Sequence, residues 1–221
     1  YKRQVLGPCI NASGRLDTAA RSLALLNAKT KEEAARLAGD LTALNQSRKA
    51  LTEKGKEEAI RIIETTELKN DRVLVVYLPD CHESLAGIIA GRIREKYHRP
   101  AFVLTGGETS AKGSGRSIES YSMYEELVKC ADLMIQFGGH PMAAGLSIEE
   151  KNIEEFRRRL NVNCTLTDEE LRPKIVIDVP MPVSYITKEL VEQISLLEPF
   201  GKGNTKPVFA QKNLRVLDHS I

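Results

Sequence analysis

Glycine-rich segments that also carry Ser, Arg or His are the parts of this sequence best suited to chemistry. One of them, Gly113 to Ser117, reads GSGRS. Glycine lets a backbone approach a ligand closely, successive N–H groups can surround an anion, and a guanidinium matches the oxygens of a phosphate. Gly113, Ser114 and Arg116 are therefore candidate phosphate ligands. A hairpin turn with a surface arginine accounts for the same residues equally well.

A second segment, Phe137 to Gly145, reads FGGHPMAAG. It predicts the end of a helix, a turn of the chain at Gly138 and Gly139, and a histidine, His140, presented beside small residues. Such a histidine can donate a hydrogen bond to a phosphate or act as an acid or base near neutral pH. The alternative is a glycine pair that caps the helix, followed by a partly buried histidine.

Two further positions are suited to contact with an anion. His82 follows a predicted strand, where α/β proteins place their ligand crevices, although an exposed polar loop is an equal alternative. Asn11 and Arg15 lie in INASGRLD, which we interpret as a Gly/Ser loop that enters a helix. Helix N-termini favour anions. The alternative there is helix capping by Ser13, with Arg15 as a surface charge.

Other reactive centres are missing from the sequence. It contains no P-loop, no GxSxG motif, no Cys–His dyad with a clear partner and no Asp/His cluster able to bind two metals. Its cysteines form no CxxC pair and are expected to be free thiols. By themselves the residues indicate an anion-binding module and no more. The cysteines are Cys9, Cys81, Cys130 and Cys164.

The composition is ordinary for a soluble globular protein: 221 residues, 42% hydrophobic and 28% charged. A net charge of +2 gives no strong attraction to nucleic acid, so such binding needs a local basic groove. No apolar run approaches the length of a membrane span and no signal peptide is visible, so we expect a cytoplasmic protein. Because the chain starts at Tyr1 and both ends look cut, we expect a fragment of a longer protein.

A long helix is the most distinctive predicted element. Residues 1–14 read as a loop and residues 15–27 as a helix, after which Thr30 and Glu33 form a capping box. Apolar residues at three- and four-residue spacing then predict one helix to about Thr66, roughly 50 Å long. We expect it to connect two domains, with a coiled-coil partner surface as the alternative. Its apolar positions are Ala34, Leu37, Leu41, Leu44, Leu51, Ala59 and Ile62.

An alternation of strands and helices follows, which is typical of an α/β domain. A polar linker at residues 161–173 separates it from a last unit that is too small to be a domain by itself. The predicted strands are residues 73–78, 101–104, 143–148, 175–179 and 207–216. The predicted helices are residues 84–97, 122–136, 150–160 and 187–197, with a Gly-rich loop at residues 106–117.

Together and in this order, the motifs resemble one family, RecJ of the DHH phosphoesterase superfamily. GPCINASGRLDTA (7–19) resembles the segment that closes the family's catalytic domain, and CHESLAGIIAGRIREKYHRPAFVL (81–104) resembles its HEGVIGIVAGRL-type motif. KGSGRS (112–117) and FGGHPMAAG (137–145) resemble the two motifs of the DHH-associated domain. LEPFGKGNTKPVF (197–209) resembles the entry to the OB-fold that RecJ proteins carry next.

The resemblance implies an α/β fold, in which a DHH-associated domain with a mixed sheet flanked by helices follows a long connector helix and precedes a partial OB-fold. The implied divisions are the end of the DHH catalytic domain at residues 1–29, the connector helix at 30–68, the DHH-associated domain at 69–162 and the start of the OB-fold at 173–221. One departure is Cys9, which stands where an arginine is common and so removes one expected contact to DNA.

The implied activity of the intact protein is a 5′-to-3′ exonuclease that hydrolyses single-stranded DNA to mononucleotides in DNA repair and recombination. Two Mn²⁺ or Mg²⁺ ions would sit on an upstream DHH domain and none on this chain, so we expect the chain alone to be inactive. Single-stranded DNA is the implied partner, with repair proteins such as a single-strand-binding protein or a helicase. The alternatives are another DHH-family phosphodiesterase, acting on oligoribonucleotides or cyclic dinucleotides, and a non-catalytic single-strand-binding module.

The resemblance also implies roles for the candidate residues. Ser114 and Arg116 would hold a phosphate, the 5′-terminal one. His140 would be the catalytic residue and, with the backbone of Gly138 and Gly139, would lie against the scissile phosphate. Asn11 and Arg15 would line the path of the strand, and His82 would shape the site. Gly113 would belong to the phosphate-binding or nucleic-acid-binding residues.

Overall fold

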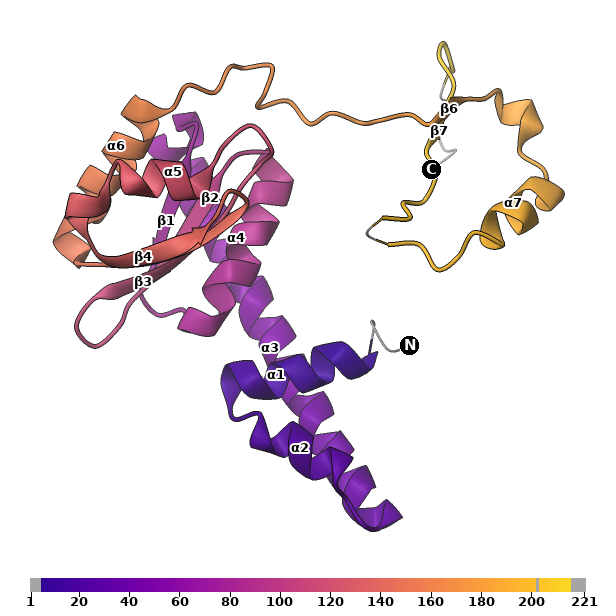
Figure 1. The fold of residues 1–221 in the computed structure, drawn as a ribbon, viewed down its shortest axis with the longest axis horizontal. Coiled ribbons are helices and arrows are strands. Elements are labelled where there is room, and N and C mark those ends of the chain that lie inside the picture. The colour runs from indigo at the N-terminus through magenta and orange to yellow at the C-terminus, as the bar shows by residue number, and fades with distance from the viewer. Residues whose placement is uncertain (1–4, 202, 216–221) are drawn as a thin grey trace. The chain divides into compact units, whose positions relative to one another are not determined.

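The structure is a computed structural model that describes residues 5–201 and 203–215 (Figure 1). The chain divides into two compact units, with the boundary between Arg172 and Pro173. The first unit holds helices α1 to α6 and strands β1 to β5, and the second holds β6, α7 and β7. None of the helices within these residues combines the length and hydropathy that a membrane span requires.

The N-terminal segment is helical, so the loop predicted for residues 1–14 is wrong over the residues described. Helix α1 spans Gly7–Leu16 and has a proline in its first turn, where no helical N–H is lost. Helix α2 spans Ala20–Leu26, which is shorter than the predicted helix at 15–27. Arg15 therefore lies in the last turn of α1 and not at a helix N-terminus.

Ser13 explains why a Gly/Ser segment is helical here. Its hydroxyl donates to the carbonyl oxygen of Ile10 at 2.9 Å and shares a hydrogen bond with the Ser22 hydroxyl at 2.7 Å. Both serines are buried. Small polar side chains that read as a loop in the sequence therefore join α1 to α2.

Helix α3 spans Lys31–Thr65 and confirms the predicted long helix. The Glu33 N–H donates to the Thr30 hydroxyl at 3.1 Å, as the capping box predicts. Its 35 residues make it about 52 Å long. One end packs against α1 and α2 and the other against α4 and β1 (Figure 1), so the helix joins the α1–α2 pair to the sheet.

The predicted apolar stripe of α3 is only partly buried. Leu51 is 45% exposed, whereas the polar Asn45 and Thr52 are buried. Gly55 is a packing position, since a Cβ there would lie 2.6 Å from the Cδ1 atom of Ile89 on α4. The glycine that weakens an isolated helix therefore lets α4 approach α3.

Five strands form one mixed sheet in the order β1-β2-β3-β5-β4, which confirms the predicted class. The parallel strands β1 (Leu74–Leu78) and β2 (Ala101–Thr105) are joined by α4 (Glu83–Tyr97). The other neighbours are antiparallel. The remaining strands are β3 (Ala111–Arg116), β5 (Ala143–Ile148) and the edge strand β4 (Met134–His140).

Three predictions for this sheet are wrong, and one of them is the turn at Gly138 and Gly139, which lie within β4. The Gly-rich residues 106–117 contain β3, in the middle of the sheet, because Gly113 and Gly115 fill its buried positions without an apolar side chain to reveal the alternation. The helix predicted at residues 122–136 ends early. It is α5, Met123–Val128, whose Ser122 makes no side-chain cap, and β4 follows.

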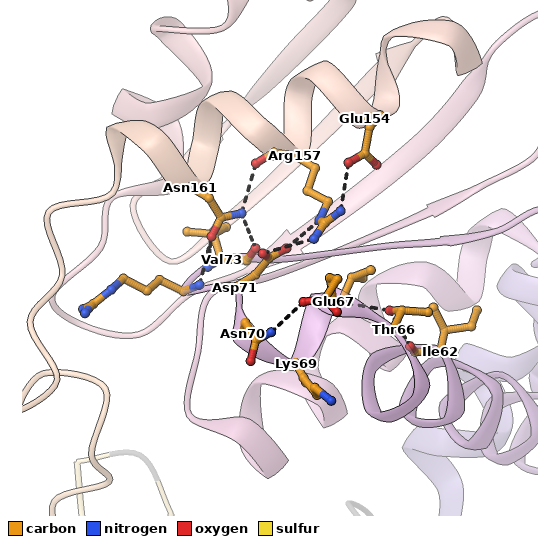
Figure 2. A network of polar contacts seen from close by, with 12 residues as sticks. Ile62, Thr66, Glu67, Lys69, Asn70, Asp71, Val73, Glu154, Arg157 and Asn161 are labelled. Atoms are coloured by element: carbon orange, nitrogen blue, oxygen red, sulfur yellow. Dashed lines mark hydrogen bonds and ion pairs between the residues drawn. The ribbon is translucent and has the colours of Figure 1, made fainter.

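Apolar layers cover all of one face of the sheet and, on the other face, the strands β1 and β2. On one face lie α5 and α6 (Ile153–Asn163), where the Phe102 and Phe156 rings meet edge to face with centroids 5.4 Å apart. On the other lie α3 and α4, with Ile63 and Ile89 in the core. Figure 2 shows the polar network that joins the segment before β1 to α6, in which Arg157 pairs with Asp71 at 2.5 Å.

The second unit contains a two-stranded parallel sheet of β6 (Val179–Pro180) and β7 (Phe209–Ala210). The strands predicted at residues 175–179 and 207–216 are therefore much shorter over the described residues, and residue 216 lies outside them. Helix α7, Lys188–Ser195, confirms the predicted helix.

Candidate functional site

The strand register brings two of the sequence motifs onto one face of the sheet. Arg116 of β3, Ala143 of β5 and His140 of β4 form one cross-strand row. Directly opposed residues of antiparallel strands project to the same side. The side chains of Arg116 and His140 therefore share a face, with Cα atoms about 10 Å apart, two strand spacings.

The next row on this face is almost without side chains, and we call it the bare row. It consists of Ser114, Gly145 and Gly138. A Cβ at Gly138 would meet no atom within 4 Å, and a Cβ at Gly145 would approach only a backbone oxygen, at 3.8 Å. The two glycines leave open space in front of the β5 and β4 backbone, and Ser114, Arg116 and His140 border it. We call these two rows the open face.

Gly139 and Gly113 serve the fold in a different way. Gly139 has a φ of +154°, and a Cβ there would lie 2.5 Å from the carbonyl oxygen of Ala143. A Cβ on Gly113 would lie 3.2 Å from carbon atoms of Leu104 and Leu146 in the core. Both positions exclude a side chain for packing reasons, and their contact with a phosphate stays a prediction.

The guanidinium of Arg116 lies between β3 and α4. Its Nη1 donates to the carbonyl oxygen of Gly115 at 2.7 Å. Its Nη2 is 2.7 Å from the place that a Cβ on Gly87 would take. Burial, and next the charge of the nearby Arg15, lower the pKa of Arg116. No carboxylate in the described part of the chain forms an ion pair with Arg116 or Arg15. A bound anion would therefore neutralise the positive charge of these two side chains.

Arg15 and His82 meet at the first turn of α4. The Nη1 of Arg15 donates to the carbonyl oxygen of Ser84 at 2.5 Å. The Ser84 N–H in turn donates to Nδ1 of His82 at 3.3 Å, so His82 is the N-cap of α4. Asn11 is exposed on α1, four residues before Arg15 and so on the same side of that helix. Asn11, Arg15 and His82 thus come from two helices that meet near the open face.

A hollow of about 260 Å³ lies beside the open face. Lys112 and Glu83 line it, and they form an ion pair at 2.6 Å that cancels their charges. Ser114 and Ser147 line it as well. The positive charge available to a ligand therefore comes from Arg116 and Arg15 and not from Lys112.

Two site positions carry no chemical signal in the sequence. Gly145 is the middle of the bare row, and Gly87 contacts the key guanidinium. An alternation of small residues, Ala143, Gly145 and Ser147, with buried apolar ones is the pattern that could have identified the open side of β5.

The groups of this site suit a phosphate. Guanidinium, hydroxyl, imidazole and open backbone are the groups that proteins use to bind nucleic-acid phosphates. Among residues 5–201 and 203–215, no three His, Cys, Asp or Glu side chains cluster so that they could hold a metal ion. The four cysteines are free, as predicted.

Two parts of this chain match known protein domains. Residues 70–164 match the DHHA1 domain, and residues 177–221 match the RecJ OB domain. The single-stranded-DNA-specific exonuclease RecJ of Bacillus subtilis (strain 168) is 36% identical over 91% of this chain and 26% of its own length. Crystal structures of RecJ from Thermus thermophilus in complex with Mg²⁺ and with Mn²⁺ each match with a TM-score of 0.78. The Mg²⁺ complex is 30% identical, and the match covers 92% of this chain and 32% of the RecJ chain. The Mn²⁺ complex is 29% identical, and the match covers 93% of this chain and 30% of the RecJ chain. The chain thus spans about a third or less of the length of these relatives.

Proposed function

Since this chain belongs to the RecJ family, we propose that it is the phosphate-binding part of a 5′-to-3′ single-stranded-DNA exonuclease, which releases mononucleotides in DNA repair and recombination. One observation carries the proposal. The open face presents bare backbone at Gly138 and Gly145, with Arg116 at one end of the adjoining row and His140 at the other. A strand of phosphates can lie against such a surface without any base-specific contact.

The charges near the open face favour a terminal phosphate. Arg116 and Arg15 lie close enough for the charge of Arg15 to lower the pKa of Arg116. A phosphate between them relieves this repulsion, and a terminal phosphate, with more charge than an internal one, relieves it most. Ser114, which faces the same side, supplies a hydroxyl to the same group. We therefore place the 5′-phosphate at Ser114 and Arg116.

The remaining candidates follow the strand from that end. His140 borders the open face at the sheet edge, and no neighbour in the described residues hydrogen-bonds its imidazole. We propose that it lies against the scissile phosphate and holds or moves a proton there. Asn11 and Arg15 line the strand path, and His82 shapes it by capping α4.

Hydrolysis in the intact protein would use Mg²⁺ or Mn²⁺, the ions in the related RecJ structures. Such ions activate water and stabilise charge on a phosphate. The described residues offer no cluster of three ligands for them, so the metal ligands are proposed to lie on an upstream domain. This chain supplies phosphate and single-strand binding.

The RecJ OB match favours this function over that of other DHH phosphodiesterases, because it covers the second unit with a module named for RecJ. An OB-fold binds single strands by charge and by stacking. Contacts with a single-strand-binding protein or a helicase, and a place in the cytoplasm of a bacterium, remain parts of the proposal.

The proposal is tested by fluorescence anisotropy of this chain with a short oligothymidine that carries a 5′-phosphate or a 5′-hydroxyl. We expect tighter binding of the phosphorylated end and about tenfold weaker binding of it by Arg116→Ala, the value of one charge-assisted hydrogen bond. The plot of the logarithm of the association constant against the logarithm of the salt concentration should also become less steep by about 0.7 in this variant. Arg92→Ala, an exposed arginine of α4 paired with Glu95, is the matched control. Equal binding of both ends by the wild type, or no effect of Arg116→Ala, would contradict the proposal.

A further inference from the structure

We propose that Gly87 and Gly91 form a trough on α4 that positions the guanidinium of Arg116 for its phosphate. The role of the phosphate rests on the function proposed above. The position of the Arg116 side chain does not depend on that function, because it follows from contacts within this chain. Gly87 and Gly91 are then positioning residues, which act on the ligand through Arg116.

The two glycines lie on one side of the helix, because residues four apart are neighbours on a helix surface. A Cβ on Gly91 would lie 4.0 Å from Cγ of Arg116. A Cβ on Gly87 would lie 2.7 Å from Nη2 and 3.3 Å from Cζ of the same side chain. The stem of Arg116 therefore passes Gly91 and its guanidinium rests on Gly87.

The trough decides where the positive charge of Arg116 goes. Arg116 ends β3 opposite Ala101, the first residue of β2. From there the side chain runs along α4 toward the turn where Arg15 meets Ser84. A side chain that left the trough would lose the hydrogen bond to the Gly115 carbonyl and its place beside Arg15.

Helix propensity makes the two glycines informative. Glycine is among the least favourable residues in a helix interior, so an alanine at either position would suit α4 better in isolation. The space at Gly87 is already taken by the Arg116 guanidinium, whereas a methyl group at Gly91 would make an ordinary contact. The trough thus predicts opposite outcomes for two substitutions of the same kind on the same helix.

The placing is tested by the Nε–Hε resonances of arginine in ¹H–¹⁵N spectra of this chain, with Arg116 assigned by its loss in Arg116→Lys. Gly87→Ala meets the flexible end of a side chain and not backbone, so the fold should hold and the guanidinium should move. We expect the Arg116 resonance to shift in Gly87→Ala and to stay in Gly91→Ala. An Arg116 resonance that is unmoved by Gly87→Ala overturns the inference.

The consequence for binding is tested with the 5′-phosphorylated oligothymidine. We expect Gly87→Ala to bind it about tenfold more weakly, the value of one charge-assisted hydrogen bond, with no further loss in the Arg116→Ala background. An equal loss in both backgrounds overturns the inference, since the methyl group would then act without Arg116. If Arg116→Ala binds as the wild type does, the proposed function fails and the resonance shift alone decides whether the trough exists.

Discussion

Asn161 makes two hydrogen bonds with the backbone of Val73. Its Oδ1 accepts from the Val73 N–H at 3.0 Å and its Nδ2 donates to the Val73 carbonyl oxygen at 3.0 Å (Figure 2). Oδ1 also accepts from the Arg72 N–H at 2.9 Å. β1 is an edge strand, so the segment that leads into it has no neighbouring strand on one side. One side chain of α6 therefore satisfies backbone groups that would otherwise be buried without partners.

Asn161→Ala should lower the free energy of unfolding by about 2–4 kcal/mol, because three backbone groups lose their partner. Urea denaturation measures this loss. Asn163→Ala is the matched control on the same helix, and its effect should stay within about 0.5 kcal/mol. Equal effects of the two variants would show that Asn161 does not hold β1 to α6.

Gly138 and Gly139 should respond differently to alanine. Gly139→Ala meets backbone atoms at a positive φ, so we expect a loss of about 2 kcal/mol or more in stability, measured by thermal unfolding. Gly138→Ala enters open space and should leave the melting temperature within a few degrees, yet weaken single-strand binding because its methyl group enters the open face. Wild-type affinity in Gly138→Ala would argue against ligand contact there.

His140 is exposed, so His140→Ala should change the free energy of unfolding by less than about 0.5 kcal/mol. If the imidazole donates one hydrogen bond to a phosphate, the affinity of this chain for single-stranded DNA should fall about fivefold, by roughly 1 kcal/mol. Anisotropy measures the affinity, and urea denaturation confirms the fold. Unchanged affinity would remove His140 from the strand path.

Stability should decline in alkali. Burial, and next a hydrogen bond with Glu150, raise the pKa of Tyr77 from its ordinary value of 10.0 to about 12. The folded state favours the neutral phenol, so this stabilisation is complete below pH 10 and is lost as the pH rises through 12. Tyr77→Phe should flatten the decline of the free energy of unfolding, measured with urea, between about pH 9 and about pH 11. These two values lie about one unit below and above the ordinary pKa of tyrosine. An unchanged slope would contradict the shift.

The chain alone should release no mononucleotides from single-stranded DNA in Mn²⁺ or Mg²⁺. This expectation rests on the proposal that the metal ligands lie on an upstream domain. Chromatography of the products after prolonged incubation checks this. Metal-dependent release that survives removal of contaminating nucleases would show that the chain carries a metal centre.

Much of the fold could be predicted from local patterns. The capping box at Thr30 and Glu33 and the apolar spacing predict the long helix. Apolar spacing also predicts α4, and continuous apolar runs predict β1 and β2. Several of the failures share one cause, because glycine and serine look alike in a loop, a strand and a packed helix. Ser13 in α1, Gly113 in β3 and Gly139 in β4 each owe their conformation to contacts with residues of another helix or strand.

The chemical nature of the site was present in the sequence alone: Arg116, Ser114 and His140 in Gly-rich motifs indicate phosphate binding, since side-chain chemistry does not depend on the fold. Only the tertiary structure decided how these motifs combine. The register of β3, β5 and β4 puts Arg116 and His140 in one row, and the packing of α4 lays Arg116 over Gly87. Strand register and helix packing arise from cooperative burial between segments far apart in the chain, and no single segment encodes them.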